Sequence, residues 1–368
     1  MGLPENLKLL QVSSSLEARL GGPTNVVQHT TKYLKATFNH ELLIFGRCQQ
    51  DFADLVIPTL FNNRYGFTIR KRNSAKNLIN SSDVILVHGF YLYSTLFTLS
   101  LAEKKHVYVM PHGSLEPYGA RTGKTRKVLF EWIFKYLSQN RKVHFVCASK
   151  QELVHLQSKF PDFPIELIGI GVEIPDANLT STKRVPSLTV KMSCISRLDR
   201  IKRIDLCIRA IPILLSKGYD VELHIAGGKS GALYRELLEL CEILGVSDRV
   251  FFVGFLNAEE KEDLLLHSKI FLLTSENENF SVATAEAIAF HVPVIVGPNV
   301  GMCDFVETFK TGKVLAELSE FDLAEGVIEI LQDYDNLEQN CKDNAFRLGW
   351  DVVFEKWIEV FSRLRGSV

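Results

Sequence analysis

Short apolar runs rich in β-branched residues alternate with helix-length segments along the whole chain. Strands separated by helices are joined by crossovers, so they pair in parallel and are covered by the helices on both faces of the sheet. The pattern runs twice, once in each half of the chain. The predicted strands are residues 8–12, 41–45, 84–88, 107–111, 143–148, 190–195, 221–226, 250–253, 270–274 and 292–296. We therefore predict an α/β protein with two Rossmann-like domains.

The two halves of this pattern meet at a polar segment, residues 176–187, which contains proline and has no apolar periodicity. We place a first domain at residues 1–180 and a second domain at residues 181–348. After them, residues 350–364 carry apolar side chains at helical spacing. We therefore expect residues 349–368 to form a separate C-terminal helix.

Two glutamates, Glu278 and Glu286, lie eight positions apart between the last two predicted strands. We expect the first in a loop and the second about two turns into the alanine-rich helix at residues 281–290. The N-terminus of that helix then lies at the carboxyl edge of a parallel sheet, where phosphates and sugars bind. One carboxylate can meet a sugar and the other a ribose, with a diphosphate between them. The residues expected at the diphosphate are Asn279, Phe280, Ser281 and Val282.

Glutamates on a helix and its preceding loop are more often solvated surface than part of a site. Here the predicted helix carries Ala283, Ala285, Ala287 and Ala289 between two apolar strands. A helix of this composition is buried on most sides, so a carboxylate within it needs a ligand hydroxyl or a neighbouring donor. We therefore favour a binding role for the two glutamates.

The spacing of Glu278 and Glu286 resembles the E-x7-E signature of retaining GT-B glycosyltransferases of the GT4 type. The resemblance extends from about residue 8 to about residue 360 and is strongest between residues 190 and 310. It implies two Rossmann-like domains facing across a cleft, with a C-terminal helix that crosses back to the first domain. It also implies that the second domain binds the donor, with Glu278 on sugar hydroxyls and Glu286 on ribose hydroxyls.

Residues 193–205 resemble the G-R-L-x-x-x-K-G stretch of the same family, and Arg197 and Lys202 match its two cations. The resemblance implies that both cations bind the donor diphosphate and balance the charge on the leaving nucleotide. A solvated basic turn is the alternative. Four glycines of the family are replaced in this chain, by Ser196, Arg203, Ser281 and His291.

Three glycines and a histidine extend the resemblance. Gly21 and Gly22, after the first predicted strand, resemble the glycine-rich loop that lies against the donor diphosphate. Gly227 belongs to a turn that borders the nucleotide base in the family. His112 follows a predicted strand of the first domain, and the resemblance implies a role at the reacting face of the donor sugar. The alternatives are plain turns and a buried structural histidine.

The composition is that of a globular enzyme, with 46% hydrophobic and 23% charged residues. No apolar run approaches the roughly 20 residues that cross a bilayer, and no secretion signal is recognised, so we expect a cytoplasmic protein. The seven cysteines have no paired spacing and predict neither disulfides nor a zinc site. The resemblance implies no cofactor and no catalytic metal, and no Asp-x-Asp stands at a predicted strand end.

The first half of the chain is basic, since residues 1–185 carry 23 Lys and Arg against 14 Asp and Glu. A predicted helix in this half mixes aromatic and aliphatic residues with Arg121, Lys124, Arg126, Lys127 and Lys135. Such a helix can hold a protein against anionic lipid at the inner face of the cytoplasmic membrane. A charge run is more often a solvated face, so membrane contact is a hypothesis.

Together these features predict a retaining glycosyltransferase. It moves a hexose from a UDP- or GDP-sugar to a saccharide or lipid-linked acceptor in cell-surface polysaccharide biosynthesis, and it binds no nucleic acid. One alternative is a GT-B epimerase that converts a UDP-sugar without an acceptor. A second is a catalytically silent scaffold subunit of a polysaccharide assembly complex. The sequence does not specify the base, the sugar, the acceptor or the linkage.

Overall fold

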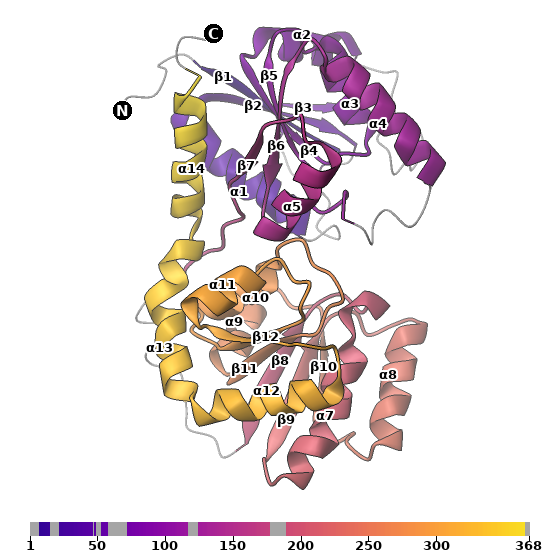
Figure 1. Ribbon diagram of the computed structural model, residues 1–368, viewed down its shortest axis with the longest axis vertical. Coiled ribbons are helices and arrows are strands. Elements are labelled where there is room, and N and C mark those ends of the chain that lie inside the picture. Colours follow the sequence, from indigo (N-terminus) through magenta and orange to yellow (C-terminus); the bar gives the residue numbers. More distant parts are fainter. Residues whose placement is uncertain are drawn as a thin grey trace. The chain divides into compact units, whose positions relative to one another are not determined.

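The computed structural model describes residues 7–14, 22–46, 48, 53–57, 72–116, 124–176 and 189–364. Contacts between residues divide the chain into two compact units. Unit 1 contains residues 1–170 and 353–368, and unit 2 contains residues 171–352. Each unit is built on one parallel sheet with helices packed against it (Figure 1). The functional boundaries at residues 180 and 348 remain a prediction.

The sheet of unit 1 has seven parallel strands in the order β3-β2-β1-β4-β5-β6-β7. These strands are β1 (Lys8–Ser13), β2 (Asn39–Phe45), β3 (Leu55–Ile57), β4 (Val84–His88), β5 (His106–Met110), β6 (Lys142–Cys147) and β7 (Ile165–Leu167). The strand order reverses at β1, which pairs with β2 on one side and β4 on the other. In doubly wound sheets, ligands bind beyond the carboxyl ends of the strands at such a reversal.

Helices cover both faces of this sheet. They are α1 (Gly22–Thr37), α2 (Arg72–Ser81), α3 (Tyr93–Leu101), α4 (Lys124–Ser138) and α5 (Lys150–Lys159). Residues of α2 to α5, among them Phe97 and Phe134, share one apolar core with alternate strand residues such as Leu10 and Val12. On the opposite face, Val27 of α1 packs in a second cluster. The two-residue period of the strands thus directs Leu10 and Gln11 to opposite faces.

The sheet of unit 2 has six parallel strands in the order β10-β9-β8-β11-β12-β13. They are β8 (Val190–Ile195), β9 (Val221–Ala226), β10 (Val250–Gly254), β11 (Ile270–Leu273), β12 (Val294–Val296) and β13 (Gly312–Val314). The order reverses between β8 and β11, which are neighbours. The carboxyl ends of these two strands are therefore where a ligand is expected.

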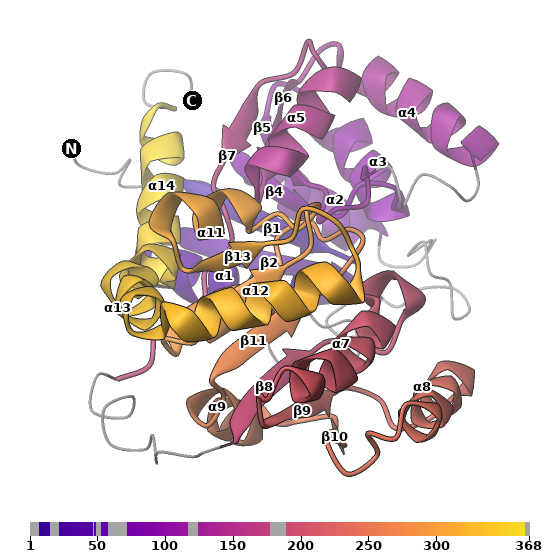
Figure 2. The same cartoon turned by 60° about the horizontal axis from the view of Figure 1, so that its bottom comes forward.

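The helical elements of unit 2 are η3 (Arg200–Lys202), α7 (Ile204–Ser216), α8 (Ala232–Ile243), α9 (Ala258–Leu266), α10 (Val282–Ala289), α11 (Cys303–Phe309), α12 (Glu320–Gln332), α13 (Tyr334–Asn344) and η4 (Ala345–Leu348). Helices α7 and α12 lie side by side (Figure 2). Buried residues of α7, α8 and α12, including Ile208, Leu237 and Val327, form one core with the sheet. Among the described helices, none has both the length and the apolar composition needed to cross a bilayer.

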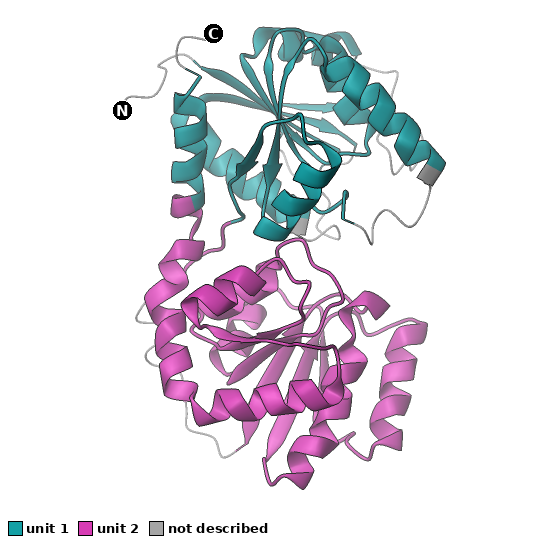
Figure 3. Ribbon diagram, in the orientation of Figure 1, with its two compact units in different colours: residues 1–170, 353–368 teal, residues 171–352 magenta. Residues whose placement is uncertain are grey.

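The C-terminal helix α14 (Trp350–Ser362) crosses the division between the units, which falls at residue 353 (Figure 3). From that residue onward it packs on unit 1. The ring of Phe354 lies 5.4 Å from that of Tyr33, and the ring of Phe361 lies 5.6 Å from that of Phe38. The prediction that the last helix returns to the first half of the chain is confirmed.

All ten predicted strands are present, with ends that differ from the predicted ends by two residues or fewer. Three strands were not predicted, namely β3, β7 and β13. Each has three residues and lies at the edge of its sheet. Three residues are too few to show an apolar run or a two-residue period. The predicted α/β fold with two parallel sheets is nevertheless confirmed.

Candidate active site

Two loops at the strand reversal of unit 2 are hydrogen-bonded to each other. One follows β8 and contains η3, and the other follows β11. The buried Thr274 hydroxyl, just after β11, lies 2.8 Å from the carbonyl of Arg203 and 3.1 Å from that of Lys202. The amide of Glu276 donates to the carbonyl of Ile201 at 2.8 Å. Residues more than 70 positions apart in the sequence are thereby held in one place.

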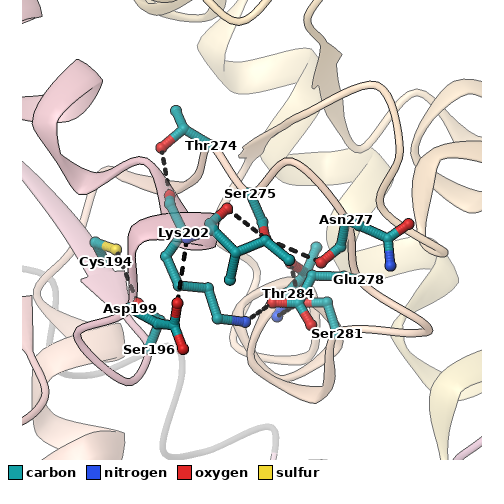
Figure 4. Close-up of polar contacts among 11 residues, drawn as sticks. Cys194, Ser196, Asp199, Lys202, Thr274, Ser275, Asn277, Glu278, Ser281 and Thr284 are labelled. Carbon is teal, nitrogen blue, oxygen red and sulfur yellow. Dashed lines mark hydrogen bonds and ion pairs between the residues drawn. The ribbon is translucent and has the colours of Figure 1, made fainter. Parts of the chain in front are cut away.

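Lys202 and Glu278 form an ion pair between these loops (Figure 4). Their side chains are 12% and 20% exposed, so the pair is accessible from one side only. The backbone of Glu278 is held by the loop after β12, because its amide donates to Asn299 at 3.0 Å and its carbonyl accepts from Gly301 at 2.8 Å. Burial, and then the charge of Arg197, lower the pKa of Lys202 to about 8. Lys202 is therefore mainly a cation at pH 7.

Arg197 lies in the same loop as Lys202, between β8 and η3, and its side chain is exposed. Its guanidinium makes no ion pair with any residue that the structure describes. It lies close enough to Lys202 for its charge to lower the pKa of that lysine. The loop therefore presents one unpaired and one paired cation, which suits an anion with more than one charge.

Helix α10 begins four residues after Glu278. Its N-cap, Ser281, accepts a hydrogen bond from the amide of Thr284 at 3.3 Å. Phe280 is 8% exposed, and the side-chain oxygen of Asn279 is buried without a hydrogen-bond partner among the described residues. Val282 is the first helical residue, so the amides that precede the helix lie in the predicted place. A helix N-terminus carries partial positive charge and adds to the attraction for an anion.

Glu286, the fifth residue of α10, forms an ion pair with Lys261 of α9. Its side chain is 15% exposed, and most of the other residues of the helix are buried. The prediction that a carboxylate in this helix needs a partner is confirmed, and the partner is a neighbouring lysine. Lys261 was not predicted. It lies 25 residues earlier in the chain, and no motif around it indicates the pairing.

Gly227, in the turn after β9, packs directly against the loop that carries the cations. A Cβ at this position would lie 2.4 Å from the carbonyl oxygen of Ser196, so a larger residue requires that loop to move. Beside this turn the side chain of Phe255, which follows β10, is 80% exposed. A Cβ at Gly228 would lie 3.4 Å from its ring. Phe255 was not predicted, and its exposed ring offers a flat surface on which a base can stack.

The remaining predicted residues belong to unit 1. His112 follows β5 in a left-handed conformation, with φ of 53°. Its Nε2 lies 2.9 Å from Nδ1 of His88, a residue that was not predicted, and burial lowers the pKa of His112 to about 4. Gly22 follows the first strand as predicted, but it is the first residue of α1 and not part of a loop. Gly21 lies outside the described residues.

A cavity of about 450 Å³ lies next to η3, between α7 and α8, but Lys202 and Glu278 do not line it. Two arginines of the cavity wall are paired already. Arg200 donates to both carboxylate oxygens of Glu236 at 2.7 and 2.8 Å, and Arg203 contacts Asp205 at 3.1 Å. The wall carries five carboxylates against three arginines, so it has no surplus of positive charge to attract a diphosphate. We therefore place the site at Lys202 and Glu278.

Residues 186–348 match the family described as glycosyl transferases group 1. The chain is 28% identical over 171 residues to an uncharacterized glycosyltransferase of Methanocaldococcus jannaschii. The matched segment covers 45% of this chain and 43% of that protein. It is 28% identical over 185 residues to the putative colanic acid biosynthesis glycosyltransferase WcaL of Salmonella typhimurium. This match covers 48% of the chain and 45% of WcaL. The chain thus matches less than half of the length of these relatives.

The whole chain is similar in structure to Anabaena HepE, which was solved in complex with UDP. The TM-score is 0.77 at 17% identity, and the match covers 97% of this chain and 100% of that one. Identity at this level shows the fold alone. The chain therefore has the GT-B fold, and its residues 186–348, which contain Arg197, Lys202, Glu278 and Glu286, match the glycosyl transferases group 1.

Proposed function

We propose that the protein is a retaining GT4-type glycosyltransferase that transfers a hexose from a UDP- or GDP-sugar to a saccharide or lipid-linked acceptor. One observation carries the proposal. At the strand reversal of unit 2, the Lys202–Glu278 ion pair lies before the N-terminus of α10 and beside Arg197, which forms no ion pair with a described residue. Cations and helix amides suit a diphosphate, and a carboxylate suits sugar hydroxyls.

In this proposal the donor diphosphate binds Arg197 and Lys202, and Lys202 exchanges Glu278 for a phosphate oxygen. Glu278 then accepts hydrogen bonds from hydroxyls of the sugar. Positive charge at this place stabilises the nucleoside diphosphate as the glycosidic bond breaks, so the proposal requires no metal. Addition of a chelator is then expected to leave the rate unchanged, and a loss of activity restored by Mg²⁺ or Mn²⁺ would contradict this part.

The nucleoside end of the donor is assigned to Glu286 and Phe255. Glu286 accepts hydrogen bonds from the ribose hydroxyls, while Lys261 orients its carboxylate. The base stacks on the exposed ring of Phe255, next to the glycine turn at Gly227 and Gly228. The complex of HepE with UDP supports a nucleotide in this fold.

Retention of configuration follows if the acceptor hydroxyl attacks the donor sugar on the same face that the diphosphate leaves. The new bond forms between the acceptor oxygen and the anomeric carbon as the bond to the diphosphate oxygen breaks. The acceptor proton passes to that phosphate oxygen. The name of the WcaL relative, which refers to colanic acid biosynthesis, supports a saccharide acceptor in a surface polysaccharide.

We also propose that α4 of unit 1 rests on anionic lipid. Four apolar residues on this helix are between 57% and 65% exposed, namely Val128, Leu129, Trp132 and Tyr136. Their spacing places them along one face. Exposed Arg126 and Lys135 on the same helix add positive charge. Lys127 is less available, because its ammonium lies 4.9 Å from the centre of the Tyr91 ring.

Flotation with vesicles tests the membrane contact. We expect binding to vesicles that contain phosphatidylglycerol and little binding to pure phosphatidylcholine. Leu129→Ser combined with Trp132→Ser is expected to abolish flotation. Ile243→Ser, at a side chain of unit 2 that is 81% exposed, is the matched control. Unchanged flotation of the double variant would contradict the contact.

A thermal-shift screen tests the donor site. We expect UDP or GDP and their sugars to raise the melting temperature, and Arg197→Ala combined with Lys202→Ala to abolish the effect. Arg200→Ala is the control, because it removes a cation of the same loop that is paired with Glu236. With the responding donor, NMR of the product anomer tests retention. No shift with any nucleotide would contradict the enzyme and favour a scaffold, and sugar conversion without acceptor would favour an epimerase.

A further inference from the structure

A chain of polar side chains is buried between the sheet of unit 1 and α1. Gln11 of β1, His40 of β2 and His88 of β4 are 0%, 8% and 3% exposed. Nε2 of His40 lies 3.0 Å from Oε1 of Gln11, and Nε2 of Gln11 lies 2.8 Å from Nε2 of His88. Nδ1 of His88 lies 2.9 Å from Nε2 of His112, which is partly exposed. This series of hydrogen-bonded side chains crosses the strand reversal at β1 and β4 and ends at His112, a predicted site residue.

One contact determines the direction of these hydrogen bonds. Nε2 of Gln11 lies 3.3 Å from the backbone carbonyl of Val27, and a carbonyl oxygen can only accept. This end of the Gln11 side chain is therefore its NH₂ group. The opposite end is therefore Oε1, which accepts from Nε2 of His40 at 3.0 Å. The Thr31 hydroxyl also lies 2.8 Å from Oε1, but its one hydrogen is shared with the Val27 carbonyl at 2.7 Å. The second hydrogen of the NH₂ group donates to Nε2 of His88, so that nitrogen carries no proton.

The protonation of His112 follows from that of His88. A neutral imidazole has one N–H group, so His88 carries its proton on Nδ1 and donates it to Nε2 of His112. Burial keeps both rings neutral, because it lowers the pKa of His88 well below 6.5 and that of His112 to about 4. His112 must then carry its own proton on Nδ1. No described residue forms a hydrogen bond with that nitrogen.

We propose that Gln11 and His88 are positioning residues that hold His112 as a hydrogen-bond donor through Nδ1. The two imidazole rings stack with centroids 5.1 Å apart and 15° between their planes, which also restricts the orientation of His112. A donor at this place selects an oxygen that can accept. That the acceptor is a hydroxyl oxygen of the donor sugar rests on the proposed function. The assignment of the proton to Nδ1 of His112 does not rest on the proposed function.

Two-bond ¹H–¹⁵N NMR spectra of the full-length protein, labelled with ¹⁵N-histidine, test the proton assignment at neutral pH. We expect Nε2 of His112 to have the shift of a bare nitrogen and Nδ1 that of a protonated one. Comparison with His112→Gln identifies the signals. A proton on Nε2, or averaging between the two nitrogens, would overturn the proposal. No nucleotide is needed, so this result is independent of the proposed function.

Variants of His88 test the consequence for activity. His88→Asn places an amide N–H near the position of Nδ1, whereas His88→Leu, of similar shape, has no donor. We expect kcat to fall roughly 100-fold in His88→Leu, as when one donor to a reacting group is removed, with little change in KM for the sugar nucleotide. His88→Asn is expected to recover most of the loss and to retain the proton on Nδ1 of His112.

A control separates this role from a general effect on folding. His106→Phe alters another buried strand histidine of unit 1, whose two ring nitrogens have no hydrogen-bond partner among the described residues. It is expected to leave kcat unchanged. Equal losses of kcat in His88→Asn and His88→Leu, matched by equal losses of melting temperature, would overturn the positioning role.

Discussion

Lys202 and Glu278 neutralise each other across two adjacent loops, although 76 residues separate them in the sequence. In the proposed function, a diphosphate that binds Lys202 competes with Glu278, and the released carboxylate becomes available to the sugar. In that proposal the pair links binding of the two halves of the donor. Its two members are consequently expected to respond differently to mutation.

Glu278→Gln is expected to separate nucleotide binding from transfer. The amide leaves Lys202 without its competing carboxylate, so the affinity for UDP should remain the same or rise. Transfer should fall by about 100-fold or more, because the carboxylate that is proposed to orient the sugar is lost. Calorimetry with UDP and initial rates measure the two effects. Glu276→Gln, two residues earlier in the same loop, is the control, and loss of UDP affinity in Glu278→Gln would contradict the assignment.

The pH dependence of donor use is expected to follow Lys202. Burial lowers its pKa to about 8, and only the protonated form attracts a diphosphate. The value of kcat/KM for the donor should thus be constant below this pKa and fall as the pH rises through about 8. Lys202→Arg keeps the charge at high pH and should move the fall upward. A pH–rate profile of the free enzyme tests this, and an unchanged profile in the variant would assign the titration to another group.

Glu286→Gln is expected to weaken binding of UDP without weakening binding of inorganic pyrophosphate. Only UDP carries the ribose that the carboxylate is proposed to hold. A hydrogen bond to a charged group contributes about 1.5–3 kcal/mol, which corresponds to roughly 10- to 100-fold in Kd. Inhibition constants for the two ligands measure the difference. Lys261→Met, which removes only the partner of Glu286, should have a smaller effect in the same direction.

The sequence predicts the loops of the site better than the contacts within them. The strand β11 is an apolar run of four residues and β8 alternates apolar with polar residues, so the positions of the loops after them could be predicted. Contacts such as those of Lys202 with Glu278 and of Glu286 with Lys261 depend on hydrogen bonds between distant segments. No local pattern in the sequence predicts these contacts. The His88–His112 contact is of the same kind, since it requires β4 and β5 to be paired first.

The replaced glycines show a second limit. Arg203, Ser281 and His291 stand where the resemblance implies glycine. All three nevertheless adopt left-handed backbone conformations, with φ of 48°, 77° and 61°. The surrounding hydrogen bonds thus impose a conformation that the residue type does not favour. Residue identity alone therefore does not reveal the local backbone conformation.

His291→Gly is expected to give a more stable unit 2 than His291→Ala. His291 follows the last turn of α10, where its amide bonds to Ile288 and the next amide bonds to Ala287 at 2.9 Å. This is the Schellman arrangement, in which glycine is preferred. His291→Ala removes the same side chain but keeps the left-handed strain. We expect the glycine variant to exceed the alanine variant by about 1 kcal/mol in free energy of unfolding, measured by urea denaturation. Equal stabilities would show that the strain is negligible.

Mild acid is expected to destabilise unit 1 before unit 2. Burial lowers the pKa of His40, His106 and His112 from 6.5 to about 4. Between these values the unfolded chain binds more protons than the folded one, so stability falls as the pH falls from about 6.5 and stops falling below about 4. For His40 alone the shift corresponds to about 3 kcal/mol.

Amide hydrogen exchange at about pH 7 and about pH 5 measures this difference, after correction for the intrinsic rate. Protection should decrease in peptides from β1, β4 and β5 and change less in peptides from β8 and β11. His106→Phe removes one of the titrating groups without breaking a hydrogen bond. It should therefore reduce the loss of protection in unit 1. Equal losses in the two units at about pH 5 would mean that these histidines do not determine the acid sensitivity of the fold.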